Sequence, residues 1–202
     1  VEPNGQNCIF TYGGSNMAVS PEDIDEVFSH FDAGDYLLMQ NELSNFTYLL
    51  RAAVGRGLRV VLNASPISEE VLAADLTGVD WLVVNEIECA AIAGCSTAEE
   101  GYAALRARYP GLGILLTLGS EGSVSWKDGA EIRQCAYPVQ AVDTTGAGDT
   151  FMGYFVGCLA QGMERKDAMQ YAAMAASIAV TRPGAAPSIP MMAEVRAAVE
   201  AL

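Results

Sequence analysis

The sequence alternates short apolar runs with segments of helical character, and this alternation restricts the fold more than any other feature. Four runs have the length and composition of buried strands: Tyr36–Gln40, Leu58–Leu62, Trp81–Val84 and Ile114–Leu118. A segment with helix-start signals follows each of them. Because parallel strands joined by helices are buried on both sides, we predict an α/β fold in which a mostly parallel sheet is flanked by helices on both faces.

Caps, turns and apolar periodicity predict the remaining elements. Helices are expected at Pro21–Phe28, Ser44–Gly55, Ser68–Ala74, Glu86–Ala93, Thr97–Arg108, Ala147–Ala160, Arg165–Thr181 and Met191–Ala201. A first strand is expected at Cys8–Tyr12. An antiparallel edge hairpin is expected from Ser123–Trp126 and Glu131–Ala136. No repeat or long linker divides the sequence, so residues 1–202 are predicted to form a single α/β domain.

The composition excludes several classes of protein. The 11 basic and 25 acidic residues give a net charge of −14, while 51% of the residues are apolar. A disordered chain would be less apolar, and a protein that binds nucleic acid through phosphate neutralisation would be richer in Lys and Arg. We therefore expect no nucleic-acid partner. Any anionic substrate must be held by local groups against the field of the whole protein.

The numbers and spacing of histidine and cysteine exclude further kinds of catalytic site. His30 is the only histidine, which excludes Ser-His-Asp and Cys-His catalysis, and it is expected in a surface loop. The five cysteines form no C-x-x-C pair and are expected to be buried free thiols: Cys8, Cys89, Cys95, Cys135 and Cys158. No signal peptide or membrane-spanning run is visible, so we expect a cytoplasmic protein without a membrane partner. The apolar residues of the last helices, Tyr154 and Phe155 among them, are expected in the core.

Polar residues stand at the carboxyl ends of the predicted strands, where open α/β sheets bind their ligands. They are Asn41, Glu42, Asn63, Asn85, Glu88 and the stretch from Gly119 to Gly122. This rule predicts the location of a site and leaves its chemistry open.

The strongest local signal is the nine-residue run D-T-T-G-A-G-D-T-F at residues 143–151, which opens a predicted helix. The small residues Gly146, Ala147 and Gly148 leave backbone N–H groups accessible at a helix N-terminus, where the helix dipole favours an anion such as phosphate. Asp149 is placed to accept a proton from a substrate hydroxyl. The alternative is a glycine-rich turn with Asp149 as an ordinary first-turn acid. The run is neither a Walker A loop nor the G-x-G-x-x-G dinucleotide fingerprint.

The run resembles the second signature of the PfkB carbohydrate kinases, a family of the ribokinase-like superfamily, and is most similar to its ribokinase branch. Further stretches resemble the family in the same order, and together they cover essentially the whole chain: 37–42, 63–66, 85–88, 117–122, 140–151 and 179–190. The resemblance implies a ribokinase-like fold and an ATP-dependent sugar kinase that transfers the γ-phosphoryl group to a primary hydroxyl. Ribose is the first expectation, with fructokinase, 2-keto-3-deoxygluconate kinase and nucleoside kinase left open.

The resemblance also implies roles for individual residues. Asp149 would be the catalytic base, and Gly146, Ala147 and Gly148 would form the anion hole for the transferred phosphoryl group. Asn85 and Glu88 match an N-x-x-E motif that organises Mg²⁺ through water, for which the alternative is that Glu88 lies on a solvated helix face.

Three further sets of residues receive roles in the same way. The nucleotide would contact Asn63, Thr117, Gly119, Ser120 and Gly122, which could otherwise be plain turn residues. A monovalent cation, most simply K⁺, would be held largely by backbone carbonyls of Asp143, Thr145, Ala179, Arg182, Gly184 and Ser188. Glu42 would contact the sugar, while the stretch Gly13-Gly14-Ser15-Asn16 departs from the family's usual Gly-Ala-Asn arrangement.

The resemblance begins partway through the family's sequence. We therefore expect these residues to be the C-terminal nucleotide-binding and catalytic portion, with the N-terminal sugar-binding loop and lid strands missing. For the full-length protein, we keep open assembly into a homodimer. A nucleotide-binding module without activity is the second hypothesis, and a non-enzymatic α/β scaffold is the third.

Overall fold

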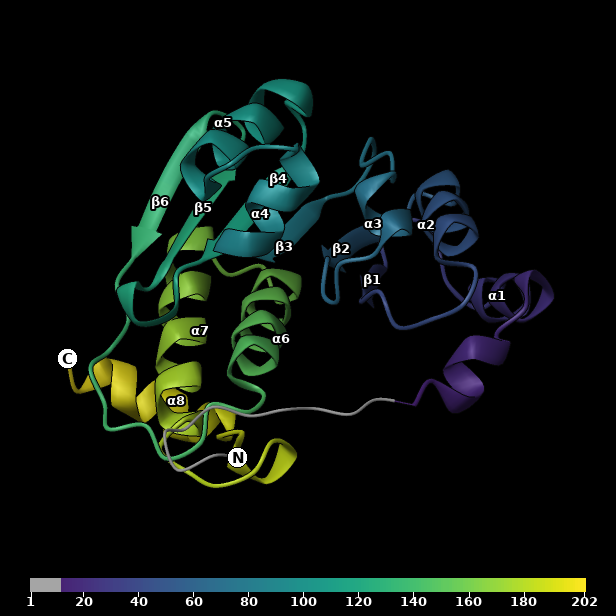
Figure 1. Cartoon of the computed structure of the whole chain (residues 1–202). Coiled ribbons are helices and arrows are strands. Elements are labelled where there is room, and N and C mark those ends of the chain that lie inside the picture. Colours follow the sequence, from purple (N-terminus) through teal and green to yellow (C-terminus); the bar gives the residue numbers. More distant parts are fainter. Residues whose placement is uncertain (1–11) are drawn as a thin grey trace. The chain divides into compact units, whose positions relative to one another are not determined.

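The computed structural model describes residues 12–202 (Figure 1), so the predicted strand Cys8–Tyr12 lies outside the described residues except for Tyr12. Contacts between Cα atoms divide these residues into two compact units. We call residues 12–117 and 124–131 the sheet unit, and residues 118–123 and 132–202 the C-terminal unit. Each is described by itself.

The sheet has six strands in the order β1-β2-β3-β4-β5-β6. Its first four are β1 (Tyr36–Met39), β2 (Arg59–Asn63), β3 (Trp81–Asn85) and β4 (Gly113–Thr117), and each of the three neighbouring pairs is parallel. Consecutive residues of β2, β3 and β4 are buried, although neighbouring side chains point to opposite faces of a strand. These strands are therefore buried on both faces, as their continuous apolar sequence predicts.

The hairpin of β5 (Ser123–Lys127) and β6 (Ala130–Gln134) closes one edge of the sheet as an antiparallel pair. The residues between these strands, Asp128 and Gly129, have φ values of 52° and 80°. A two-residue turn with positive φ at both positions matches the right-handed twist of the strands, which is why an Asp-Gly pair stands here.

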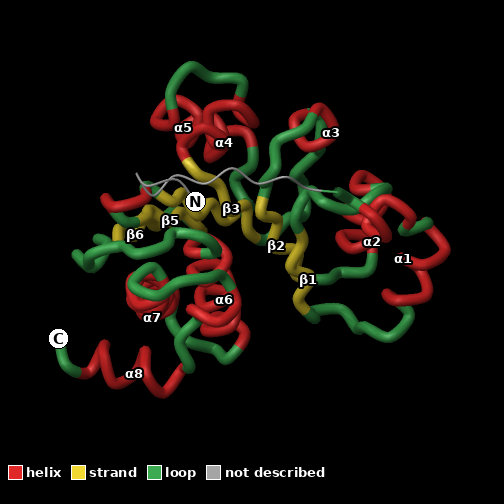
Figure 2. The backbone as a smooth tube through the Cα atoms, turned by 60° about the horizontal axis from the view of Figure 1, so that its bottom comes forward, coloured by secondary structure: helices red, strands yellow, loops and turns green. Residues whose placement is uncertain are grey.

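Five helices belong to the sheet unit: α1 (Pro21–Phe28), α2 (Phe46–Gly55), α3 (Glu69–Leu72), α4 (Glu86–Ala93) and α5 (Ala98–Arg108). Figure 2 shows α2, α4 and α5 on one side of the strands. A capping box begins α1, because the Ser20 side chain accepts from the Asp23 amide while the Asp23 carboxylate accepts from Ser20. A single-turn 3₁₀ segment, η1 (Gly14–Ala18), was not expected.

The C-terminal unit is mainly helical. It contains α6 (Ala147–Ala160), α7 (Arg165–Ala179) and α8 (Met192–Glu200), together with the 3₁₀ turns η2 (Gly119–Glu121) and η3 (Ala186–Ser188). Helices α6 and α7 lie side by side, and α8 packs on α7 (Figures 1 and 2). Met174, Ala175 and Val195 form a buried cluster between α7 and α8.

The described part of the chain confirms the predicted fold: a mostly parallel sheet with an antiparallel edge pair, flanked by helices. Helices α1, α4 and α6 have the predicted bounds, and every other predicted element within residues 21–202 is displaced by at most two residues at either end. Within residues 12–202 no helix is long and apolar enough to span a bilayer. The lone histidine, His30, is exposed as predicted.

The cysteine prediction was right for two of the four described residues and wrong for one. Cys89 and Cys158 are buried free thiols, and burial raises the pKa of Cys89 to about 11. Cys95 is half-buried. Cys135 is exposed because it follows the last residue of β6, an edge strand without a further neighbour in the described sheet. Cys8 lies outside the described residues.

Gly101 of α5 tests the packing of the sheet unit. A Cβ added there would lie 2.7 Å from the carbonyl oxygen of Cys89 and 3.1 Å from the Cα of Ala90, both in the backbone of α4. An exposed helical glycine gains up to about 1 kcal/mol from replacement by alanine. Overpacking against backbone costs about 1–3 kcal/mol. We expect Gly101→Ala to lower the free energy of unfolding by about 1–2 kcal/mol in urea titrations, since the overpacking term is larger.

Gly153→Ala is the matched control, because Gly153 is exposed in α6 and an added Cβ meets nothing within 4 Å. That variant should be more stable by up to about 1 kcal/mol. Stabilisation by both substitutions would contradict the close approach of α4 and α5.

Candidate functional site

The turn that begins α6 has the form expected of an anion cradle. Gly146 is its N-cap and has φ of 74°, a left-handed conformation that a residue with a side chain adopts only under strain. Ala147, Gly148 and Asp149 follow as the first three helical residues, and Asp149 is exposed. A Cβ added to Gly148 would meet nothing within 4 Å, so the space beside this backbone is open. First-turn N–H groups have no acceptor within the helix and can serve a ligand.

The Ala147 amide already has an acceptor in this turn. It donates to the carbonyl oxygen of Thr144 at 3.2 Å, a long hydrogen bond that closes the turn before the helix. If Ala147 serves in the predicted anion hole, its N–H must either leave the Thr144 carbonyl for the ligand or donate to both in a bifurcated hydrogen bond.

Asp143 anchors this turn to the segment that follows α7. Its Oδ1 accepts from the Thr145 amide and its Oδ2 from the Gly184 amide, each at 2.9 Å. The hydrogen bonds from Thr145, and then the one from Gly184, hold the pKa of Asp143 below its usual range, so the carboxylate stays charged at neutral pH. The backbone amide of Asp143 also donates to the carbonyl of Val180.

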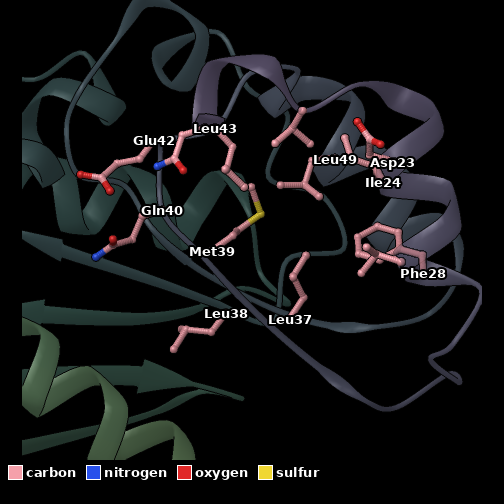
Figure 3. A pocket seen from close by; sticks show the side chains of 13 residues that line it. Asp23, Ile24, Phe28, Leu37, Leu38, Met39, Gln40, Glu42, Leu43 and Leu49 are labelled. Atoms are coloured by element: carbon pink, nitrogen blue, oxygen red, sulfur yellow. The ribbon is translucent and has the colours of Figure 1, made fainter. Parts of the chain in front are cut away.

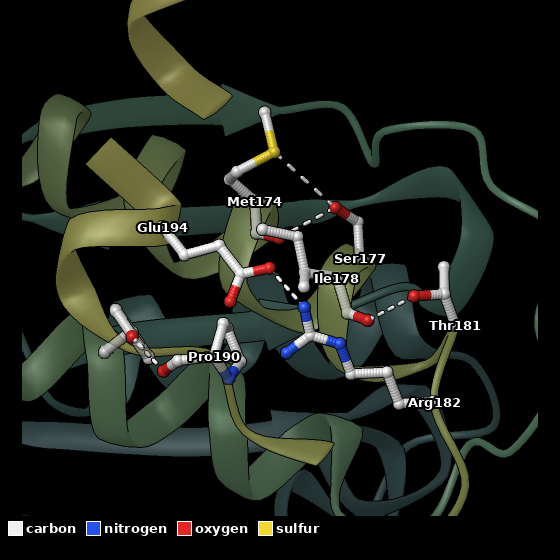
Figure 4. A network of polar contacts seen from close by, with 8 residues as sticks. Met174, Ser177, Ile178, Thr181, Arg182, Pro190 and Glu194 are labelled. Carbon is white, nitrogen blue, oxygen red and sulfur yellow. Dashed lines mark hydrogen bonds and ion pairs between the residues drawn. The ribbon is translucent and has the colours of Figure 1, made fainter. Parts of the chain in front are cut away.

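The segment after α7 carries the other residues predicted to bind a cation. Arg182 pairs with Glu194 of α8 (Figure 4), and its amide donates to the carbonyl of Ala179 at 3.0 Å. The Ser188 hydroxyl donates to the carbonyl of Ala185 at 2.7 Å. The structure thus brings Asp143 into direct contact with Thr145 and with Gly184. Carboxylate and carbonyl oxygens are the ligands that alkali and alkaline-earth cations take, so the donor set fits a monovalent cation.

In the sheet unit, Asn85 and Thr117 end the neighbouring strands β3 and β4 and stand in register. Asn85 also begins α4 in a reciprocal capping box with Glu88: the Asn85 amide donates to Glu88 Oε2, and the Glu88 amide donates to Asn85 Oδ1, each at 2.9 Å. Glu88 is only 9% exposed, so it does not lie on a solvated helix face. The Thr117 hydroxyl donates to the carbonyl of Val84.

This pair fits Mg²⁺ in the way the N-x-x-E motif implies. The capping box uses Oε2 of Glu88, and Oε1 accepts no hydrogen bond within residues 12–202. Mg²⁺ needs only one or two carboxylates because it retains several of its waters. Within those residues no three His, Cys, Asp or Glu side chains cluster as a metal cage, so such an ion would be held largely through water.

The remaining predicted nucleotide residues lie in turns. Asn63 ends β2, and its Oδ1 accepts from the Ser65 amide at 3.3 Å. Gly119 has φ of 54° and open space around it, and Ser120 is exposed. Gly122 has φ of 103°, and a Cβ there would collide with the carbonyl oxygen of Gln134. Gly122 is therefore required by the turn itself, whereas the openness around Gly119 leaves its backbone accessible.

Glu42 follows β1 and is exposed at one end of a mostly apolar groove of about 490 Å³ (Figure 3). Asn16, the last residue of the stretch that departs from the family's usual Gly-Ala-Asn arrangement, also lines this groove. Neighbouring Asn41 donates from its amide nitrogen to the Pro66 carbonyl at 2.6 Å and to the Ser68 hydroxyl at 2.8 Å, and so fixes the chain after β1. No hydrogen bond within the described residues joins Glu42 to another predicted site residue.

Sequence reasoning missed two polar contacts of the C-terminal unit. Tyr154, expected only as a core residue, donates from its hydroxyl to the carbonyl of Pro190 at 2.5 Å. Glu194, the partner of Arg182, stood in a predicted helix without any distinguishing signal. Both contacts join residues distant in the sequence, so a local motif could not have revealed them.

Comparison with known proteins gives one consistent result. The model of the pfkB family of carbohydrate kinases matches residues 1–192. A ribokinase of Staphylococcus aureus is 33% identical over 205 residues, covering 96% of this chain and 66% of its own length. Two solved ribokinases share the fold. That of Thermotoga maritima has a TM-score of 0.82 at 28% identity, over 99% of this chain and 67% of its own.

The second is the ribokinase of Arabidopsis thaliana complexed with ribose and ATP, with a TM-score of 0.78 at 31% identity, over 98% of this chain and 66% of its own. The chain thus spans about two thirds of the length of these three proteins. The family model matches nearly the whole chain, and the run at residues 143–151 has the cradle geometry described above. The chain belongs to the pfkB family of carbohydrate kinases.

Proposed function

We propose that the protein is an ATP-dependent sugar kinase of the ribokinase type, which transfers the γ-phosphoryl group of ATP to the primary hydroxyl of a sugar, with ribose as the first candidate. The observation that carries the proposal is the first turn of α6: an open, small-residue helix N-terminus with an exposed carboxylate at its third position. The similarity to the Arabidopsis thaliana ribokinase, solved with ribose and ATP, supports the choice of both substrates.

The residues of α6 would divide the work as follows. The N–H groups of Gly146, Ala147 and Gly148, together with the positive end of the helix dipole, would stabilise the charge on the phosphoryl group in transfer. Asp149 would accept the proton of the sugar hydroxyl as that oxygen attacks phosphorus. Phosphoryl transfer requires mainly positioning and electrostatic stabilisation, and the turn held by Asp143 would supply both.

Two cations complete the proposal. Mg²⁺ would neutralise charge on the phosphates of ATP and would be held through water by Asn85 and by the Oε1 atom of Glu88. K⁺ would be held by oxygens of the residues around Asp143, namely Thr145, Ala179, Arg182, Gly184 and Ser188. The nucleotide would contact Asn63, Thr117, Gly119, Ser120 and Gly122, and Glu42 would contact the sugar.

The second candidate function is a nucleotide-binding module without activity. It is favoured by one fact, that the chain spans only about two thirds of the length of its relatives. Within the family, fructokinase, 2-keto-3-deoxygluconate kinase and nucleoside kinase activities are the alternatives to ribose.

An ADP-release assay with a panel of sugars separates these functions. The assay is run with Mg²⁺ and K⁺ on the 202-residue chain and on a version with an upstream segment. We expect the largest ADP release with ribose. Asp149→Asn should reduce turnover by about 10²–10⁴-fold, the usual contribution of a general base, with ATP binding largely kept.

Absence of ADP release from both versions with every sugar would refute the kinase and leave the binding module. Joint loss of ATP binding and turnover in Asp149→Asn would assign Asp149 a structural role.

The capping box permits a clean test of Glu88. Gln can replace Glu in such a box, so Glu88→Gln should keep the free energy of unfolding within about 0.5 kcal/mol. Because the substitution removes the negative charge, we expect the Mg²⁺ concentration for half-maximal turnover to rise about 10-fold or more, the usual cost of a lost metal-organising group.

Glu88→Ala is the comparison variant, since it removes the charge and the acceptor for the Asn85 amide together. It should show the same Mg²⁺ dependence and also lose about 1 kcal/mol of stability. An unchanged Mg²⁺ dependence in Glu88→Gln would show that Glu88 only caps the helix and does not help to bind Mg²⁺.

A further inference from the structure

The segment between α7 and α8 is held at three points within the C-terminal unit. The Gly184 amide donates to Asp143, Arg182 pairs with Glu194, and the Pro190 carbonyl accepts from the Tyr154 hydroxyl. Figure 4 draws the pair of Arg182 and Glu194 together with Pro190. The segment is therefore tied to the loop before α6, to α8 and to the body of α6.

Tyr154 connects this segment to the helix that carries Asp149. It lies five residues after Asp149 in α6, with its ring half-buried against the cluster of α7 and α8. Burial, followed by the negative charge of neighbouring groups, raises the pKa of Tyr154, so its hydroxyl stays protonated and donates to the Pro190 carbonyl at 2.5 Å. The catalytic helix and the segment are thus joined by a hydrogen bond with a fixed donor and acceptor.

The segment needs such a fixed position if it binds a cation through its backbone. Carbonyl ligands are poorly determined by the side chains beside them, and a site loses affinity when its ligands are displaced by more than about 0.5 Å. Arg182, Gly184 and Ser188 all stand in the segment, and the Cβ of Ala185 lies 3.5 Å from the place a Cβ of Gly146 would take. A shift of the segment would reach both the cation ligands and the start of α6.

Besides the bond from Gly184 to Asp143, two contacts could restrain the later residues of the segment, and the exposure of their side chains indicates which is the stronger. The side chains of Arg182 and Glu194 are 37% and 42% exposed, and ion pairs of that kind contribute little because water screens them. The Tyr154 hydrogen bond is partly buried and short, and its loss would leave a partly buried carbonyl without that donor.

We propose that Tyr154 is a positioning residue: through its hydrogen bond to the Pro190 carbonyl it holds residues 182–190 in the conformation that binds a monovalent cation next to the first turn of α6. The proposal rests on the cation dependence included in the proposed function. Tyr154 acts through the segment and touches neither substrate nor phosphate.

Tyr154→Phe tests this role, because it removes the hydroxyl and keeps the ring. Tyr171→Phe is the matched control: Tyr171 packs against the same cluster, and its hydroxyl makes no hydrogen bond within residues 12–202. The melting temperature of each chain is measured at increasing KCl with ionic strength kept constant by NaCl. ADP release with ATP and ribose is measured in the same series.

We expect KCl to raise the melting temperature of the unsubstituted chain. In Tyr154→Phe a given rise in melting temperature should need about three- to tenfold more KCl, since loss of one ordering hydrogen bond changes a binding constant by this factor. Tyr171→Phe should match the unsubstituted chain. A merely structural Tyr154 would lower the melting temperature in NaCl and leave unchanged the KCl concentration that gives a fixed rise, which would overturn the proposal.

Failure of this inference can be told apart from failure of the kinase. ADP release without any effect of KCl on melting would overturn the role of Tyr154 while the kinase stands. An effect of KCl on melting without ADP release would refute the kinase, and the KCl concentrations that give a fixed rise in the two variants would still decide the role of Tyr154.

Discussion

The C-terminal unit depends on the carboxylate of Asp143. Its two oxygens accept amide hydrogen bonds from Thr145, two residues onward, and from Gly184, beyond α7. One short side chain therefore determines where the turn before α6 lies and where the segment after α7 joins it. The left-handed Gly146 then turns the chain into the helix, and the first-turn N–H groups are left beside open space at Gly148. The anion cradle and the start of the segment that carries the proposed cation ligands are therefore tied to the same carboxylate.

Structure and proposed chemistry use the same residues in both units. Asn85 and Glu88 begin α4 as a reciprocal capping box and still leave one carboxylate oxygen for a hydrated cation. Gly146 is needed for the turn whatever the cradle binds, and Gly122 is needed because the Gln134 backbone lies against it. Each of these motif residues thus has a structural role and a proposed chemical role. A variant that keeps the structural role and removes the chemical one is required to separate the two.

The sequence predicted the elements well because their signals are local. Ser20 and Asn85 are side-chain caps, and Gly146 is a glycine that only a turn requires, so α1, α4 and α6 begin where expected. The order of the candidate site residues along the strands could be predicted for the same reason. Contacts between distant segments could not: the bond of Asp143 to Gly184, the bond of Tyr154 to Pro190 and the burial of Glu88 depend on tertiary packing. Cys135 was misplaced because apolar character does not show that a strand lies at a sheet's edge.

The central claim is that the first turn of α6 binds the transferred phosphoryl group and is not merely a glycine-rich turn. Gly148→Ala tests it most directly, because the added methyl meets nothing beyond the backbone of its own helix within 4 Å and points toward the helix N-terminus. The account predicts an unfolding free energy that is unchanged or higher by up to about 1 kcal/mol. It also predicts that ribose-dependent ADP release falls at least about a hundredfold, the usual loss when an oxyanion contact is removed. An equally stable variant that releases ADP at the unsubstituted rate would contradict the account.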